Sequence, residues 1–375
     1  MTVDSETYTR PRSMPTPRAS GGEDPRSPQA ARQPARRRLL IAGPVVALAS
    51  LLAAVLTTGS VGLPLRDPDH VAGRRLAMLL GLVAVLVLLD VLVRARLRSR
   101  AGRPTRAAIA SVWRERWTMP RGVAVGTALV SFYVTYLAYR NLKSVVPLVR
   151  PGDLFDQQLA DFDRTLFGGH DPASLLHELI GTGVQAHLMS GAYMIFFAFI
   201  PGTLAFALVF ARNLQPGLFY VTAQSINWLL AAGSYFLLPA LGPVYFEPAA
   251  FADLPTTAIS QLQDLLLDQR IDFVRDPVSG AAAQSIGAFS SLHVSFFFTA
   301  ALTAHLLGLP RWLRVAAWFL LALTVAATIY LGWHYVVDDI AGVAIGAFAV
   351  LLARALTGLD LGTARRLARP ESAPT

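Results

Sequence analysis

A histidine and an aspartate in the C-terminal part of the chain have the spacing of a catalytic pair. His334 and Asp338 are four residues apart, at the junction between two apolar runs. On a helix this spacing places both side chains on one face, one turn apart. The carboxylate can then bind one imidazole nitrogen and leave the lone pair of the other free for attack or proton transfer. The alternative is a polar cap on a membrane helix.

A lysine and an arginine in the middle of the chain form a second polar segment. Lys143 is the only lysine in the sequence, and Arg150 follows it seven residues later. An ammonium is a compact charge that binds phosphate, whereas a guanidinium is a planar fork. We interpret the two as an anion clamp. The alternative is that both side chains extend toward water from the edge of a bilayer.

A serine and a histidine at the start of a further apolar run form the third segment. Ser291 and His293 lie where a polar loop becomes apolar. The free backbone N–H groups of a helix start favour an anion there. The alternative is that Ser290 or Ser291 caps the helix while His293 is an interfacial residue.

Taken together, the three segments contain the groups that phosphoryl transfer requires. The set is Lys143, Arg150, Ser291, His293, His334 and Asp338. The reaction needs charge neutralisation at the phosphoryl oxygens, an in-line nucleophile and an acid for the leaving group. These residues provide all three, so we predict a site that needs neither a metal nor a cofactor.

The composition places the chain in a membrane. Of the 375 residues, 54% are hydrophobic, and several apolar runs reach the roughly 20 residues that cross a bilayer. Helices are the expected spanning element, so the predicted fold is an all-α polytopic membrane helical bundle. The absence of cysteine excludes disulfides and thiolate sites. We interpret the net charge of +9 as flanks that orient membrane helices, and not as a nucleic-acid surface.

Eight apolar runs predict about eight transmembrane helices. They cover about 39–62, 76–93, 122–139, 184–211, 218–240, 290–308, 312–331 and 334–357. Residues 1–37 are rich in Pro, Ser, Gly and Arg, which predicts a disordered tail. Residues 358–375 form a second predicted tail.

Arginine-rich loops predict the orientation of these helices. Four segments are basic and fall on one side of the membrane if there are eight spans: the N-terminal tail, the loop at 94–121, the short turn with Arg311 and Arg314, and the C-terminal tail. Both termini are therefore expected in the cytoplasm of a multi-pass cell-membrane protein. The loop at 63–75, with Arg66, Arg74 and Arg75, fits this scheme poorly. The three polar segments are expected at the extracytoplasmic face.

The polar segments resemble the motifs of the type 2 phosphatidic acid phosphatase superfamily. Its signature is Lys, six residues, Arg-Pro; then Pro-Ser-Gly-His; then Ser-Arg, five residues, His, three residues, Asp. The matching residues are Lys143, Arg150 and Pro151, then Ser291 and His293, then His334 and Asp338. The departures from the signature are Ser290, Leu292, Ala327 and Thr328. Since Thr328 replaces the signature arginine, Arg140 and Arg270 are candidate substitutes.

Details of the motifs look more like the branch that contains inositol phosphorylceramide synthases. They are the Ser-Leu-His second motif, the Gly-Trp-His-Tyr third motif, and the segments 161–172 and 239–243. The resemblance covers residues 122–357 and implies a six-helix phosphatase-like core. Residues 38–121 would then add two N-terminal helices and a basic cytoplasmic loop.

The resemblance also implies a mechanism on a lipid-linked phosphate. His334 would attack phosphorus to form a phosphohistidine, Asp338 would stabilise the imidazolium, and His293 would protonate the leaving oxygen. The remaining residues, Lys143, Arg150 and Ser291, would hold the phosphoryl oxygens. Water as acceptor would make the protein a lipid-phosphate phosphatase. Inositol or another polyol would make it a phosphotransferase.

Two other classes of protein remain as alternatives. In a metal-dependent hydrolase, His293, His334 and Asp338 would be ligands, but the neighbouring cations oppose a metal ion. In a lipid transporter, polar residues would follow a path at mid-membrane depth. Here they gather at one face.

One further segment is predicted to cover the site. Residues 153–180 alternate acidic and apolar side chains, which is typical of an amphipathic helix in the membrane interface. Its acids, among them Asp156 and Asp163, either contact a polyol head group or face the solvent.

Overall fold

The computed structural model describes residues 28–67, 70–99, 103–278 and 283–368 as an all-helical chain. The elements are α1 (Pro28–Ser60), α2 (Val71–Arg98), α3 (Arg106–Arg116), α4 (Met119–Val149), α5 (Asp156–Leu166), α6 (Pro172–Ile180), α7 (Val184–Val209), α8 (Gln215–Leu237), α9 (Pro243–Phe246), η2 (Pro248–Phe251), α10 (Ala258–Arg275), α11 (Leu292–Leu306), α12 (Arg311–Tyr330), α13 (Val336–Thr357) and α14 (Leu361–Ala368).

Each of the eight predicted apolar runs coincides with a helix. Within the described residues, six helices are long and apolar enough to span a membrane: α1, α2, α4, α7, α12 and α13. Of the other two, α11 has 15 residues, and α8 has 23 residues but contains Gln224, Ser225 and Asn227. The predicted all-α polytopic bundle is confirmed.

The boundaries of the terminal segments differ from the prediction. α1 begins at Pro28, so residues 28–37 are helical although they were expected in the tail. α14 occupies most of the described part of the predicted C-terminal tail. The predicted disorder of residues 1–27 and the end of the second tail, 369–375, lie outside the described residues.

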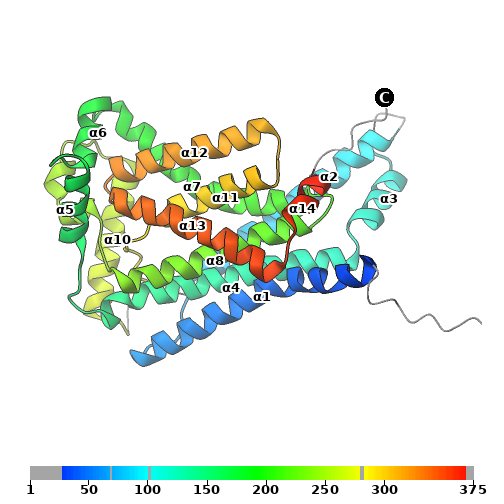
Figure 1. Ribbon diagram of the computed structural model, residues 1–375, viewed down its shortest axis with the longest axis horizontal. Coiled ribbons are helices and arrows are strands. Elements are labelled where there is room, and N and C mark those ends of the chain that lie inside the picture. The colour runs from blue at the N-terminus through cyan, green and yellow to red at the C-terminus, as the bar shows by residue number, and fades with distance from the viewer. Residues whose placement is uncertain (1–27, 68–69, 100–102, 279–282, 369–375) are drawn as a thin grey trace, which may run out of the picture.

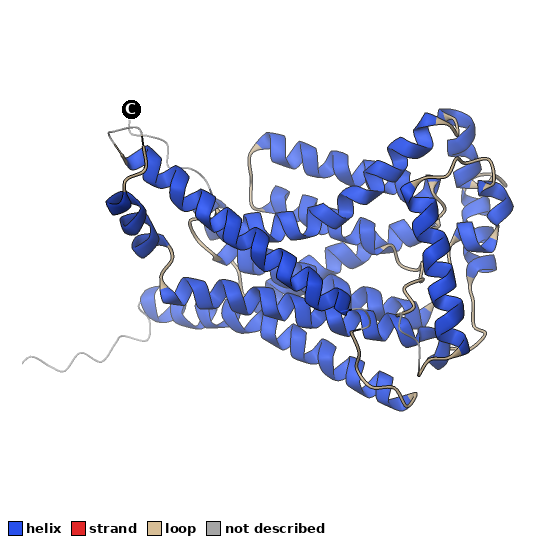
Figure 2. Cartoon of the chain, turned by 180° about the vertical axis from the view of Figure 1, so that it is seen from behind, coloured by secondary structure: helices blue, strands red, loops and turns tan. Residues whose placement is uncertain are grey.

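The long helices run side by side, and the short ones gather at the ends (Figure 1). α4, α7, α8, α11, α12 and α13 form the body of the bundle, while α1 packs along α4 and α2 packs against α7. At one end, α5, α6 and α10 lie across the ends of the long helices. Seen from behind, all of these elements are helices joined by loops (Figure 2).

Polar side chains in the centre of the bundle bond to one another. Asn227 of α8 donates to Thr299 at 2.9 Å and accepts from Ser295 at 2.6 Å, and both partners are on α11. All three are buried. Without water in the bilayer core, such groups must find partners inside the protein, and here they join α8 to α11.

Two glycines bring α13 close to α11. A side-chain carbon at Gly342 would lie 2.4 Å from the carbonyl oxygen of Ser291, and one at Gly346 would lie 2.9 Å from that of Ser295. Small residues four apart allow helix backbones to approach in membranes. This contact sets the start of α13, which follows His334, beside the start of α11, which holds His293.

The segment at 153–180 forms two helices where the sequence predicted one. α5 ends at Leu166 and α6 begins at Pro172. Between them, Gly168 and Gly169 have φ angles of 66° and 94°, a conformation that ends a helix readily because glycine has no side chain. The break lets the two helices cover different parts of the bundle end.

Candidate active site

A cavity of about 280 Å³ opens at the end of the bundle where α10 crosses. Its basic and imidazole-bearing lining residues are Arg75, Arg140, Lys143, His293 and His334. None of the lining residues, all in the described part of the chain, is an aspartate or a glutamate. The lining therefore favours an anionic ligand.

Lys143 lies inside α4, which continues ten residues beyond the predicted end at 139. Its ammonium nitrogen is 4.6 Å from the centre of the Tyr235 ring and 5.8 Å from that of Tyr139. Gln284 donates to the carbonyl oxygen of Lys143 at 3.1 Å and so holds the loop before α11 against α4. The aromatic rings position the ammonium without neutralising it.

The two histidines come from different helix starts and face each other. The ring centres of His293 and His334 are 6.0 Å apart. The His293 ring lies 4.3 Å from Tyr193 and 4.0 Å from Phe196, both on α7. A phosphorus atom between the two imidazoles would be within reach of both.

The junction between α12 and α13 fixes His334. Nδ1 of His334 lies 3.5 Å from Oδ2 of Asp338, and both side chains are buried. Asp338 also accepts the backbone N–H of Tyr335 at 3.0 Å, which caps α13. Burial lowers the pKa of His334 to about 4 against the opposing charge of Asp339. The imidazole is therefore neutral at pH 7, as a nucleophile requires.

Thr328, which replaces the signature arginine, has a structural contact. Its hydroxyl donates to Asp339 at 3.0 Å, and its carbonyl oxygen accepts the N–H of Trp333 at the same distance. Of the two candidate substitutes, Arg140 lines the cavity but pairs with Asp67 at 2.9 Å. Arg270 lies elsewhere, in a second cavity.

That second cavity, of about 80 Å³, also contains Arg150. It shares Leu241 and Gly287 with the larger cavity. Arg150 donates to Asp153 at 2.7 Å and to the carbonyl oxygen of Phe236. The structure thus places Arg150 next to the main cavity and not in its lining, in contrast to Lys143.

Like Arg150 and Asp338, Ser291 does not line the main cavity. It is fully buried and caps α11, accepting the N–H of Val294 at 3.5 Å. Its own N–H donates to the carbonyl oxygen of Asp338 at 3.0 Å. These contacts agree with the capping alternative and tie the two histidine-bearing segments together.

Two acids of α5 hold the site from outside. Asp163 accepts the N–H groups of Val336 and Val337 at 2.6 and 3.2 Å, at the start of α13. Asp156 accepts those of Leu241 and Gly242 at 2.8–3.0 Å. Both acids are buried. They therefore match neither sequence interpretation, contact with a polyol or exposure to solvent.

Arg75 and the tyrosines around Lys143 line the cavity but belong to none of the three polar segments. The one feature of the sequence that pointed to Arg75 is its place among the arginines at 63–75, which fit the predicted membrane orientation poorly. The tyrosines gave a weaker signal, namely three aromatic hydroxyls at Tyr133, Tyr136 and Tyr139, spaced by three residues along one helix. Tyr139 and Tyr136 line the cavity, together with Tyr235.

The fold and the cavity define an all-helical protein that has, in its described part, six helices able to span a membrane and a cavity lined by two histidines and three cationic side chains. A family model described as the PAP2 superfamily matches residues 157–352, slightly more than half of the chain. The chain therefore belongs to the PAP2 superfamily, as the motifs predicted. No significant match was found among curated proteins or among solved structures.

Membership indicates a phosphatase-type enzyme that acts on a lipid phosphate in a membrane. The matched residues include His293, His334 and Asp338. They begin after Lys143 and Arg150, and also after α1 and α2. The contribution of the first half of the chain has to be argued from its own contacts.

Proposed function

We propose that the protein is a lipid phosphotransferase or phosphatase that works through a phosphohistidine at His334. The observation that carries the proposal is the shared cavity of Lys143, His293 and His334, which contains cations and imidazoles without a carboxylate. Such a cavity neutralises a phosphoryl group while it leaves the nucleophile unprotonated.

The reaction would proceed in two balanced steps. In the first, Nε2 of His334 forms a bond to phosphorus as the bond to the lipid oxygen breaks. His293, whose buried ring takes up a proton when the phosphate anion binds beside it, gives that proton to the lipid oxygen. Lys143 binds the phosphoryl oxygens, and Asp338 faces the positive imidazole. Arg150 and Ser291 would act from the adjoining cavity and from the start of α11.

In the second step an acceptor hydroxyl attacks phosphorus. His293, now neutral, takes the proton of the hydroxyl, and the bond between phosphorus and Nε2 breaks to restore His334. Water as acceptor releases phosphate. Inositol or another polyol receives the phosphoryl group, and the resemblance to the inositol phosphorylceramide synthase branch supports this outcome. We place the reaction at the extracytoplasmic face of the cell membrane, on the basis of the arginine distribution.

Single substitutions of the two histidines test the proposal. His334→Ala and His293→Ala should each lower turnover of a lipid phosphate about a thousandfold, since each removes one chemical step. The measurement is product formation by the purified protein, resolved by mass with and without inositol. A phosphorylated polyol supports transfer, whereas free phosphate alone supports the plain phosphatase.

His305→Ala is the matched control because His305 is exposed at the other end of α11. It should leave turnover unchanged. Activity near that of the wild type in His334→Ala or His293→Ala, with normal insertion of the protein, would refute the assignment.

A further inference from the structure

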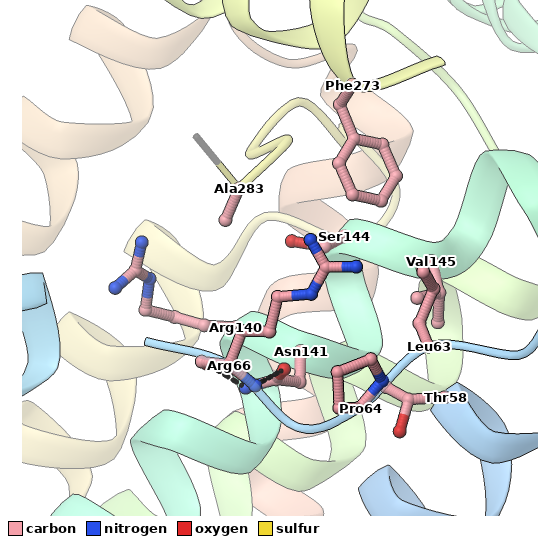
Figure 3. Close-up of a pocket in the computed structure, with 10 residues that line it drawn as sticks. All are labelled: Thr58, Leu63, Pro64, Arg66, Arg140, Asn141, Ser144, Val145, Phe273 and Ala283. Atoms are coloured by element: carbon pink, nitrogen blue, oxygen red, sulfur yellow. Dashed lines mark hydrogen bonds between the residues drawn. The ribbon is translucent and has the colours of Figure 1, made fainter. Parts of the chain in front are cut away.

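The segment at 63–75, which fits the orientation poorly, contains three arginines in different surroundings: Arg66 precedes α2, whereas Arg74 and Arg75 lie in its first turns. The side chain of Asn141, on α4, binds the backbone of Arg66. It accepts the Arg66 N–H at 2.9 Å and donates to the Arg66 carbonyl oxygen at 2.8 Å (Figure 3). The Arg66 guanidinium donates to the carbonyl oxygen of Val278 at 3.0 Å. Arg74 is exposed, and Arg75 lines the main cavity.

Arg75 is held by aromatic groups and not by an acid. Its guanidinium donates to the hydroxyl of Tyr136, and its central carbon lies 5.5 Å from the Tyr136 ring and 5.8 Å from the Phe197 ring. Within the described part of the chain it forms no ion pair. An arginine fixed in this way keeps most of its donors and its full charge available.

Arg140, the other arginine of the cavity, differs in this respect. Asp67 pairs with it and also accepts the N–H groups of Ala72 and Gly73 at the start of α2. Its charge is therefore compensated. Two cations of the cavity remain without an acidic partner in the described residues, namely Lys143 and Arg75.

These two cations occupy different parts of the cavity. Arg75 contacts Tyr136, whereas Lys143 lies near Tyr139 and Tyr235. The rings of Tyr136 and Tyr139 stack between them with their centres 6.5 Å apart. Arg75 and Phe197 are exposed although they line the cavity, so the cavity opens between α2 and α7.

We infer that Arg75 and Tyr136 form a second anion subsite at this mouth, which takes a second anionic group of the substrate head group. The inference rests on the proposed function, which assigns the reacting phosphoryl group to Lys143. The substrate class is then a lipid with two phosphate-like groups, one between the histidines and one beside Arg75. α2 would thereby contribute to substrate choice from outside the family match.

Non-hydrolysable lipids test the subsite by binding. An alkyl monophosphonate is compared with alkyl bisphosphonates of the same chain, whose two phosphorus atoms are separated by one to four carbon atoms. Binding to the full-length protein in detergent is followed by tryptophan fluorescence, because Trp228 and Trp333 line the cavity. The variants are Arg75→Ala, Arg75→Lys and, as the matched control, Arg74→Ala.

Wild type and Arg74→Ala should bind at least one bisphosphonate about tenfold more tightly than the monophosphonate, the effect of a charge-assisted hydrogen-bonded pair. Arg75→Ala should abolish this preference and leave monophosphonate affinity unchanged, while Arg75→Lys should keep part of it. Three results would overturn the subsite. In the first, the wild type binds none of the probes or shows no preference for a bisphosphonate; in the second, Arg75→Ala retains that preference; in the third, Arg75→Ala weakens the binding of both ligands equally.

A different experiment, the turnover of His334→Ala, would reveal a failure of the proposed function. It would appear as full turnover in His334→Ala, and the binding comparison would be unaffected because none of these ligands reacts.

Discussion

At His334, burial and the charge of Asp339 shift the pKa in opposite directions. Burial lowers the pKa from the ordinary 6.5 to about 4, Asp339 opposes this shift, and Lys143 adds to it. Because the ring is neutral over the physiological range, its lone pair is available without a separate base. His293 and Asp338 face the same ring from α11 and α13.

The protonation of His334 can be observed directly. Nuclear magnetic resonance of protein with isotope-labelled histidine gives one signal per ring, and the His334 signal is identified by its loss in His334→Asn. This signal should titrate near pH 4, because the ring is buried. The unfolded chain binds this proton near pH 6.5, so the contribution of His334 to stability is present above pH 6.5 and is lost as the pH falls through about 4. A midpoint at or above 6.5 would contradict this environment.

At the scale of residues, the shared membrane face and the resemblance to the superfamily motifs together predicted the convergence of three side chains. His293, His334 and Lys143 belong to motifs whose residues are close in sequence, and they line one cavity. The position of Arg150 was less predictable because the last turn of α4 directs it toward Asp153 and the carbonyl oxygen of Phe236. The cap formed by Ser291 is local, since its side chain accepts the N–H of Val294, and it agrees with the capping alternative.

Among the elements, α5 has the least expected function. Its sequence is that of an interfacial helix, yet Asp156 and Asp163 point into the structure and accept backbone N–H groups. Asp163 binds the first turn of α13, where a negative charge is favoured by the helix dipole. α5 therefore positions the segment that carries His334. No local pattern distinguishes such an acid from one that faces water.

Removal of this contact should loosen α13. Asp163→Ala leaves two half-buried N–H groups without a partner and should lower the free energy of unfolding by about 1–3 kcal/mol. Turnover should fall as well, because His334 directly precedes the affected turn. Thermal unfolding in detergent and turnover are the two measurements. Asp161→Ala is the control, since the Asp161 side chain is 59% exposed; equal effects of the two variants would contradict the positioning role.

In the molecule as a whole, the polar chemistry lies at one end of an apolar bundle. The order of the long helices followed from apolar run length, because a bilayer demands about 20 apolar residues per span. Of the eight predicted spans, six are long and apolar enough to cross a membrane in the described residues. The short helices at the bundle end were not predicted as separate elements. Their positions depend on long-range contacts such as Asp156 with Leu241 and His177 with Tyr330.

The orientation of the bundle can be tested because the natural chain has no cysteine. Arg103→Cys and Arg311→Cys are predicted to lie in the cytoplasm, and Glu178→Cys and Asp253→Cys outside it. All four positions are exposed. A membrane-impermeant maleimide added to intact cells should label the second pair, and the first pair only after lysis. The reverse pattern would place the cavity on the cytoplasmic side.

The central claim is the covalent step at His334, and trapping of the phosphoenzyme tests it most directly. After brief incubation with a lipid carrying radiolabelled phosphate and rapid quenching in alkali, the wild type should retain label that is stable to base and released by acid, as expected for a nitrogen–phosphorus bond. His334→Ala should retain none. Label of the same stability in His334→Ala, or none in an active wild type, would contradict the account.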